Sequence, residues 1–262
     1  MILRMPSNSC KAHHSGDKFV PAWQAVDRIQ RRPTEGYWLV TQPDHAHLSG
    51  RIAAAFDRQR FPWLTPALIE CIGMHDDGWR RFDGEIPHPV PPRFDANGKP
   101  LTFVELLPEM SVAAWTASVA NAVNLDALGG AVVSRHFLWL AHYRLEMGKD
   151  TPEDRDRLTR FVASEKNRQA EFASNDAATH LDEALDVLQF CDLLSLYLCS
   201  GATDNVEFPQ GFGGQPVRLT CEDGRVTLSP SPFAAPTILQ CPAFVPNRDG
   251  SFTARTIVCE IV

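Results

Sequence analysis

The sequence lacks the features that mark a membrane protein or an exported protein. No apolar run among its 262 residues approaches the roughly 20 residues of a transmembrane helix. Residues 1–19 contain no continuous apolar core, so we expect no signal peptide. Internal repeats and low-complexity segments are also absent. These absences favour a globular protein of the cytoplasm.

Positive charge is scarce as well. The chain has 25 Lys and Arg against 32 Asp and Glu, which gives a formal net charge of −7 and a pI near 5.7. This balance argues against nonspecific binding to nucleic acid or to anionic membranes. It leaves room for a locally basic pocket. The charge balance therefore does not exclude a small anionic molecule as the substrate, and we leave a homo-oligomer open.

Cysteine pairs of the C-x-x-C type are missing, although the chain has seven cysteines. The number is odd, and several of them fall in segments with helical periodicity. We expect reduced, mostly buried thiols rather than a disulfide framework or a cysteine zinc site.

Residues 1 to about 40 show no regular pattern, and helical periodicity dominates from there to residue 200. We expect helices over residues 42–58, 66–78, 111–122, 126–144, 151–172 and 176–200. Thr41 fits the N-cap of the first helix and Pro66 the first position of the second, which we expect to end at Gly78. The last helix is apolar almost all round between residues 187 and 198, which predicts a central place in a bundle.

The composition changes after residue 202. Short alternating runs predict strands at residues 217–220, 226–228, 238–240 and 256–258, and a further strand at 37–40. The pairs Asp223-Gly224 and Asp249-Gly250 are hairpin signals. We therefore predict a mainly α fold: a helical metal-binding domain over residues 1–202, and a small antiparallel β appendage over residues 203–262 that packs on it.

A His-Asp pair, His75-Asp76, carries the clearest chemical signal. In the predicted second helix it ends an apolar stripe that includes Leu68 and Ile72. A buried, ionised Asp costs several kcal/mol unless a cation compensates it, and a divalent metal is such a cation. His45 and Asp192 lie on the apolar stripes of two other predicted helices. Three helices therefore direct ligand-type side chains inward.

Two His and two Asp suit a divalent ion. Imidazole and carboxylate ligands favour Mn, Fe, Ni, Zn or Mg, and four protein ligands leave positions for water and substrate. A coordinated water would then supply hydroxide near neutral pH. We expect one or two ions.

The order His45, His75-Asp76, Asp192 resembles the H…HD…D signature of the HD-domain metal-dependent phosphohydrolase superfamily. Residues 42–45, 75–79 and 192–196 look like a bacterial branch of it whose members lack an assigned function. The resemblance implies an all-α core with the four residues on one metal ion. Many members carry Lys at the place of Trp79, so this chain has no lysine at that position for the catalytic role often given to it.

Two ligand assignments stay open. His45 and His47 compete for the first position, and periodicity favours His45, since His47 shares its face with Arg51. His136 is either a ligand of a second ion, as in some HD proteins, or a hydrogen-bonded core histidine.

The expected function is a metal-dependent hydrolase, most simply a phosphohydrolase that uses a metal-bound hydroxide. Asp76 and Asp77 are candidate catalytic carboxylates, and Arg80 and Arg135 are candidate anion ligands. Ser195 needs no catalytic role, because back-bonding within its helix accounts for it. Two alternatives remain: a dinuclear-iron oxygenase resembling myo-inositol oxygenase, and a ligand-binding module with a vestigial site.

Overall fold

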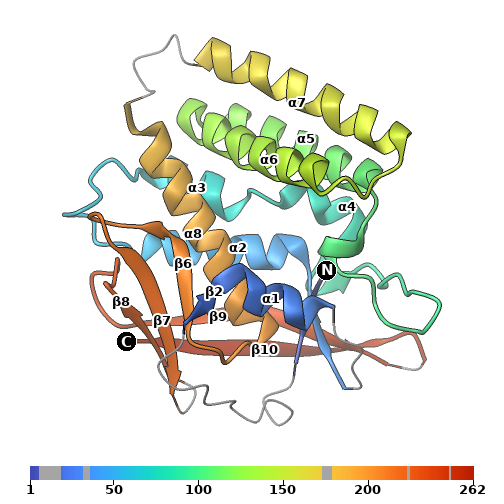
Figure 1. Ribbon diagram of the computed structural model, residues 1–262. Helices are drawn as coiled ribbons and strands as arrows, with labels where there is room; N and C mark the ends of the chain where they lie inside the picture. The colour runs from blue at the N-terminus through green and yellow to red at the C-terminus, as the bar shows by residue number, and fades with distance from the viewer. Residues whose placement is uncertain (6–18, 32–35, 173–178, 223–224, 248) are drawn as a thin grey trace.

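The computed structural model describes residues 1–5, 19–31, 36–172, 179–222, 225–247 and 249–262. Its helices are α1 (Ala22–Gln30), α2 (Gln42–Ala54), α3 (Pro66–Gly73), α4 (Arg80–Asp83), α5 (Pro108–Leu125), α6 (Ala127–Met147), α7 (Pro152–Phe172) and α8 (Leu181–Ser200), with 3-10 turns η1 (Asp77–Trp79) and η2 (Phe103–Glu105). Helices α5, α6 and α7 form a layer at the top of Figure 1, and α8 runs from that layer down to the strands.

Within the described residues, the strands form a large sheet and a short hairpin. The sheet has the order β1 (Ile2–Arg4), β3 (Trp38–Val40), β9 (Thr237–Pro246), β10 (Phe252–Ile261), β8 (Arg225–Ser229), β7 (Pro216–Glu222), β6 (Val206–Gly211) and β2 (Val20–Pro21). The hairpin joins β4 (Gly84–Glu85) to β5 (His88–Pro89). Most of the large sheet lies below the helices in Figure 1.

The predicted fold class, a helical bundle with a small antiparallel appendage, is wrong. The sheet has eight strands and is mixed, since β10 pairs with β8 and β2 pairs with β6 in parallel. Strands from before and after residue 202, the predicted domain boundary, belong to this sheet. The N-terminal strands are two or three residues long, which is too short to show the alternation by which strands are recognised.

The predicted C-terminal strands are confirmed. Residues 217–220, 226–228, 238–240 and 256–258 lie in β7, β8, β9 and β10, and residues 38–40 form β3. Asp223-Gly224 lies outside the described residues, but Glu222 and Arg225 beside it pair across antiparallel strands. Among the described residues, none of the helices is both long enough and apolar enough to cross a membrane.

Two of the predicted helices end earlier than expected. The helix that begins at Gln42 ends at Ala54, not at residue 58, and the helix that begins at Pro66 ends at Gly73, not at Gly78. Both predicted starts are confirmed: Thr41 caps the first by accepting from the Asp44 amide, and Thr65 caps the second with Pro66 at its first position. The early end of α3 leaves His75 and Asp76 in a turn.

Helices α2 and α3 approach closely through two glycines. A Cβ atom on Gly50 would lie 2.7 Å from the Cα of Gly73, which is too short for two carbon atoms. The absence of a side chain at Gly50 therefore sets the spacing between α2, which carries His45, and the helix that leads into His75. The main hydrophobic core continues from these helices through α8 to the sheet.

Four of the described cysteines, Cys71, Cys191, Cys199 and Cys241, are free and buried, as expected for reduced thiols. Cys10 lies outside the described residues.

Candidate metal centre

Five His and Asp side chains from four segments meet above the sheet. His45 comes from α2, His75 and Asp76 from the turn after α3, His136 from α6 and Asp192 from α8. Two overlapping groups have ligand atoms close enough to hold an ion: His45 with His75 and Asp76, and His75 with His136 and Asp192. All five residues predicted to bind metal are therefore brought together.

The turn after α3 directs His75 and Asp76 toward α2 and α8. The Asp77 amide donates to the Met74 carbonyl, and the Gly78 amide donates to Ser118 Oγ at 2.9 Å on α5. A Cβ atom on Gly78 would lie 1.9 Å from the Ala114 carbonyl oxygen, so only glycine allows this turn to pack against α5. Gly78, three residues after His75, is therefore required for the close packing of this turn against α5.

The distances within the cluster fit ligands of one ion. His45 Nε2 lies 3.0 Å from Asp76 Oδ2, and His75 Nε2 lies 3.4 Å from Asp192 Oδ1 and 3.9 Å from Asp76 Oδ2. Two ligand atoms about 2.1 Å from one ion lie about 3.0 Å apart in octahedral and about 3.4 Å apart in tetrahedral geometry. A small inward movement would therefore complete the coordination.

The ring of His75 is oriented by the backbone. Its Nδ1 atom donates to the Ile72 carbonyl at 2.8 Å, because a carbonyl oxygen can only accept. Its Nε2 atom is buried and makes no well-directed hydrogen bond in the described part of the chain. A buried nitrogen without such a partner, facing two carboxylates, is what a metal ligand requires.

The titration of His75 reflects its two acidic neighbours. Burial alone would lower the pKa of His75, but contact with Asp192 and the charges of Asp76 and Asp192 outweigh it and raise the pKa to about 9. Without a metal, the ring therefore holds a proton between the carboxylates at neutral pH. A divalent ion would take the place of that proton.

The pKa values of Asp192 and His136 are lowered, in contrast to that of His75. Burial would raise the pKa of Asp192, but the contact with His75 and the charges of the three histidines lower it to about 2. Burial lowers the pKa of His136 to about 4, against the charge of Asp192. Asp192 is therefore an anion and His136 a neutral imidazole at pH 7, the forms in which both groups bind metals.

Access to the cluster comes from the side of the carboxylates. The side chains of the three histidines are at most 4% exposed, whereas those of Asp76 and Asp192 are 10% and 17% exposed. Solvent therefore reaches the cluster mainly at these two carboxylates.

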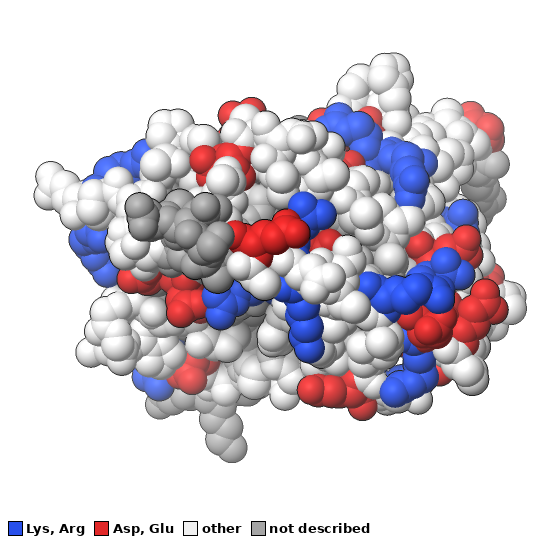
Figure 2. Space-filling view, turned by 90° about the horizontal axis from the view of Figure 1, so that it is seen from above, with Lys and Arg blue, Asp and Glu red and all other residues white. Residues whose placement is uncertain are grey.

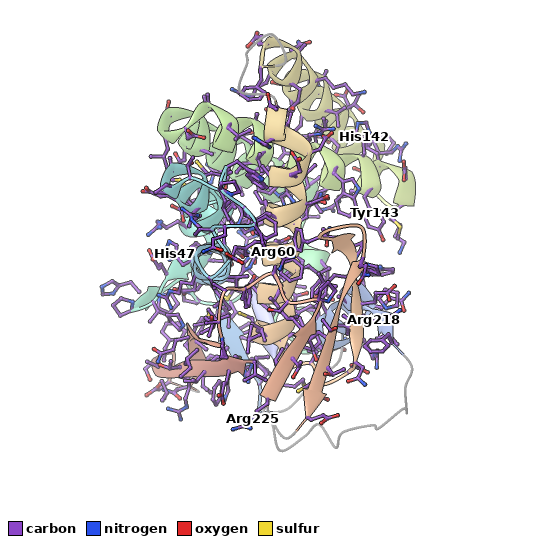
Figure 3. All side chains as sticks on the ribbon, turned by 90° about the vertical axis from the view of Figure 1, so that its left-hand side faces the viewer. His47, Arg60, His142, Tyr143, Arg218 and Arg225 are labelled. Carbon is purple, nitrogen blue, oxygen red and sulfur yellow. The ribbon has the colours of Figure 1, made fainter. Side chains whose placement is uncertain are left out.

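His47 lies in a separate polar group. Its Nδ1 atom is 3.4 Å from Glu85 Oε1 and its Nε2 atom is 3.8 Å from Asp77 Oδ1. With Asp44 and Glu85 it forms a third group whose ligand atoms lie close together, and this group is more exposed than the cluster around His75. Figure 3 shows His47 well apart from His142 of α6. Of the two competing histidines, His45 is the one in the buried cluster.

The other predicted catalytic residues lie beside the cluster or away from it. Arg80 pairs with Asp77 and with Glu85, so its charge is already shared by two carboxylates. Arg135 pairs with Asp182 at 2.7 Å near the start of α8. Asp192 lies ten residues further along that helix, about 15 Å away at about 1.5 Å per residue. Trp79 is buried with Leu106 and Ala114, as a core residue.

Sequence reasoning missed the contact between Ser195 and His45. Its Oγ atom lies 2.9 Å from His45 Nδ1, in addition to its hydrogen bond within α8. The signal was present in the spacing, because Ser195 follows Asp192 by three residues and so lies on the same face of the helix.

Comparison with known proteins adds a family but no activity. A protein-family model described as a protein of unknown function (DUF3891) matches residues 29–243. No curated protein and no solved structure matches the chain.

Proposed function

The chain belongs to the DUF3891 family, whose description gives no activity, and we propose from its site that it is a metal-dependent hydrolase. The buried Nε2 atom of His75 carries this proposal, because it faces two carboxylates and makes no well-directed hydrogen bond among the described residues. His45, His75, Asp76 and Asp192 would hold one divalent ion, with His136 beside them. The resemblance to HD-domain phosphohydrolases points to the same four residues.

An ion at this place would polarise a substrate and activate water for hydrolysis. The protein supplies two negative charges and neutral imidazoles, so a divalent ion is electrically balanced in a buried setting. The rings of His45, His75 and His136 exclude solvent from one side. Asp76 and Asp192 border the open side, where the substrate would be bound.

We propose a phosphoester as the substrate class, with Arg80 as the group that binds its charge. Arg80 follows the metal-binding turn directly, and its present partners Asp77 and Glu85 would have to yield one of their contacts. Guanidinium groups match phosphate oxygens in geometry. Figure 2 shows charges of both signs mixed over one face of the molecule, which favours a small substrate over a polyanion.

The two ligand groups favour a site for a single ion, and hence a hydrolase rather than a dinuclear-iron oxygenase. The two overlapping ligand groups share His75, whose Nδ1 atom is used by the Ile72 carbonyl. The remaining Nε2 atom has one lone pair and binds one ion. The two groups therefore describe alternative ligands of one ion more readily than two complete sites.

Metal analysis of the purified full-length protein tests the proposal. About one equivalent of divalent metal is expected in the wild type and in Asp182→Ala, and none in Asp192→Ala. Asp182 is a matched control, because it lies on the same helix but is largely exposed and contacts Arg135. The metal-loaded wild type should then release phosphate from members of a phosphoester panel, and Asp192→Ala should not.

Other results would overturn it. If the wild type retains no Mn, Fe, Ni, Zn or Mg after incubation with each, the site is not a metal centre. If it holds two irons and consumes dioxygen, it is an oxygenase. If it holds metal and binds a metabolite without turnover, it is a binding module.

A further inference from the structure

The hydroxyl of Ser195 links the two helices that carry His45 and Asp192. Its Oγ atom lies 2.9 Å from His45 Nδ1, 2.7 Å from the Asp192 carbonyl oxygen and 3.0 Å from Ser49 Oγ. Ser195 and Ser49 are completely buried, and so is His45 apart from 1% of its surface. Burial shields these contacts from bulk water, so the orientation of each group is set by its protein partners.

The hydrogens of this network follow once the single hydrogen of Ser195 is assigned to its shortest contact. A serine hydroxyl has one hydrogen and two lone pairs. Ser195 then donates to the Asp192 carbonyl at 2.7 Å. The hydroxyl of Ser49 lies 3.0 Å from Ser195 Oγ, its nearest acceptor, and 3.2 Å and 3.3 Å from the carbonyls of His45 and Cys191. One lone pair remains for His45. The Nδ1 atom of His45 fits it only as an N–H donor.

This tautomer leaves the lone pair of His45 on Nε2. That atom lies 3.0 Å from Asp76 Oδ2, and a lone pair facing a carboxylate oxygen at this distance repels it unless a cation lies between them. The network around Ser195 therefore prepares His45 for a cation on the side of Asp76. The Ile72 carbonyl prepares His75 in the same way.

We propose that Ser195, supported by Ser49, is a positioning residue of the metal centre that holds His45 with Nδ1 protonated and Nε2 free to bind the ion. The inference rests on the proposed metal centre. It also ties the two ligands together, because the same hydroxyl fixes the ring of His45 and the turn of α8 that carries Asp192.

Ser195→Ala and Ser200→Ala form a matched pair for the test. Ser200 lies on the same helix, is equally buried, and likewise donates to a carbonyl three residues before it, that of Tyr197. It has no contact with a metal ligand among its described hydrogen bonds. Titration with Zn²⁺ should show affinity reduced roughly 10–100-fold in Ser195→Ala and unchanged in Ser200→Ala.

Proton NMR of the Zn²⁺-loaded protein supplies a readout that a merely structural role would not move. The wild type and Ser200→Ala should show a downfield signal from His45 Nδ1–H, assigned by its loss in His45→Gln. In Ser195→Ala the signal should move upfield or disappear. Ser49→Ala, which keeps Ser195 but removes its supporting donor, should weaken Zn²⁺ binding less, and it remains informative if Ser195→Ala does not fold.

The two proposals fail in different ways. A wild type that binds no Zn²⁺ would overturn the metal centre itself. A wild type that binds Zn²⁺, with unchanged affinity and an unchanged Nδ1–H signal in both Ser195→Ala and Ser49→Ala, would overturn only the role of Ser195.

Discussion

The Nε2 atom of His75 lies 3.4 Å from the Oδ1 atom of Asp192, although one residue follows helix α3 and the other lies in the middle of α8. Each group accounts for the unusual pKa of the other: the carboxylate raises that of the imidazole, and the imidazole lowers that of the carboxylate. The pair is therefore charged at neutral pH when no metal is bound. Its chemistry leads to two measurable consequences.

Metal binding should release a proton at pH 7.5. The pKa of His75 is about 9 in the metal-free protein, so the ring is protonated there and must lose that proton to become a ligand. Calorimetric titration with Zn²⁺ in buffers of different ionisation enthalpy should give about one proton per ion. A result of zero protons would contradict the protonation state assigned to His75.

The contribution of His75 and His136 to the stability of the metal-free protein should be largest near pH 6.5. The pKa of His75 is raised to about 9, so its contribution is full below about 6.5 and is lost as the pH rises through 9. The pKa of His136 is lowered to about 4, so the unfolded chain binds more protons between about 4 and 6.5, and stability falls as the pH drops there.

Urea unfolding of the EDTA-treated protein between pH 4 and 9.5 measures both slopes. His75→Gln should flatten the alkaline slope and leave the acidic one, whereas His136→Gln should do the reverse. If each variant keeps both slopes of the wild type, other groups are responsible for them.

His136→Gln should keep one equivalent of metal but bind it more weakly. His136 Nε2 lies 3.8 Å from Asp192 Oδ2, at the edge of the cluster, whereas His75 is shared by both ligand groups. His75→Gln should therefore remove the metal altogether. Elemental analysis of the two variants checks this order, and a wild type with two ions that falls to one in His136→Gln would contradict the single-ion site.

Gly50→Ala should destabilise the protein by about 1–3 kcal/mol and weaken metal binding. The added Cβ would lie 2.7 Å from the Cα of Gly73 and would push α2 away from α3, which separates His45 from His75. Gly73→Ala is the matched control on the other side of this contact, since its Cβ would lie at an ordinary 3.4 Å from Gly50. Equal losses in both variants, measured by urea unfolding and Zn²⁺ titration, would count against this explanation.

The sequence predicted which side chains gather in the cluster better than it predicted the geometry that joins them. His45, His75, Asp76 and Asp192 were recognisable because polar side chains interrupt apolar stripes. The helix predicted to end at Gly78 ends at Gly73 instead, since Gly78 serves the contact with Ala114 on α5 and not the end of α3. Such a contact joins segments far apart in the chain, and no local pattern shows it.

The sheet was the larger error, and its cause is also physical. Strand β1 has three residues and β2 has two, and their pairing depends on partners in distant parts of the chain. Ser195 was missed for a similar reason: its bond within α8 was foreseeable, but its contact with His45 requires the packing of α2 against α8. Contacts between segments far apart in the chain therefore determined the sheet and the surroundings of His45, which local propensity does not specify.

The place of β3 between β1 and β9 constrains the order in which the nascent chain can fold. Leu39 pairs with Phe244, roughly 200 residues later, so at about 5–20 residues per second the ribosome delivers the partner strand on the order of 10–40 s after β3 itself. All five candidate metal ligands emerge before that partner does. During this interval the edge of β3 that later pairs with β9 lacks its native partner, and its three-residue length limits how far other chains can pair with it.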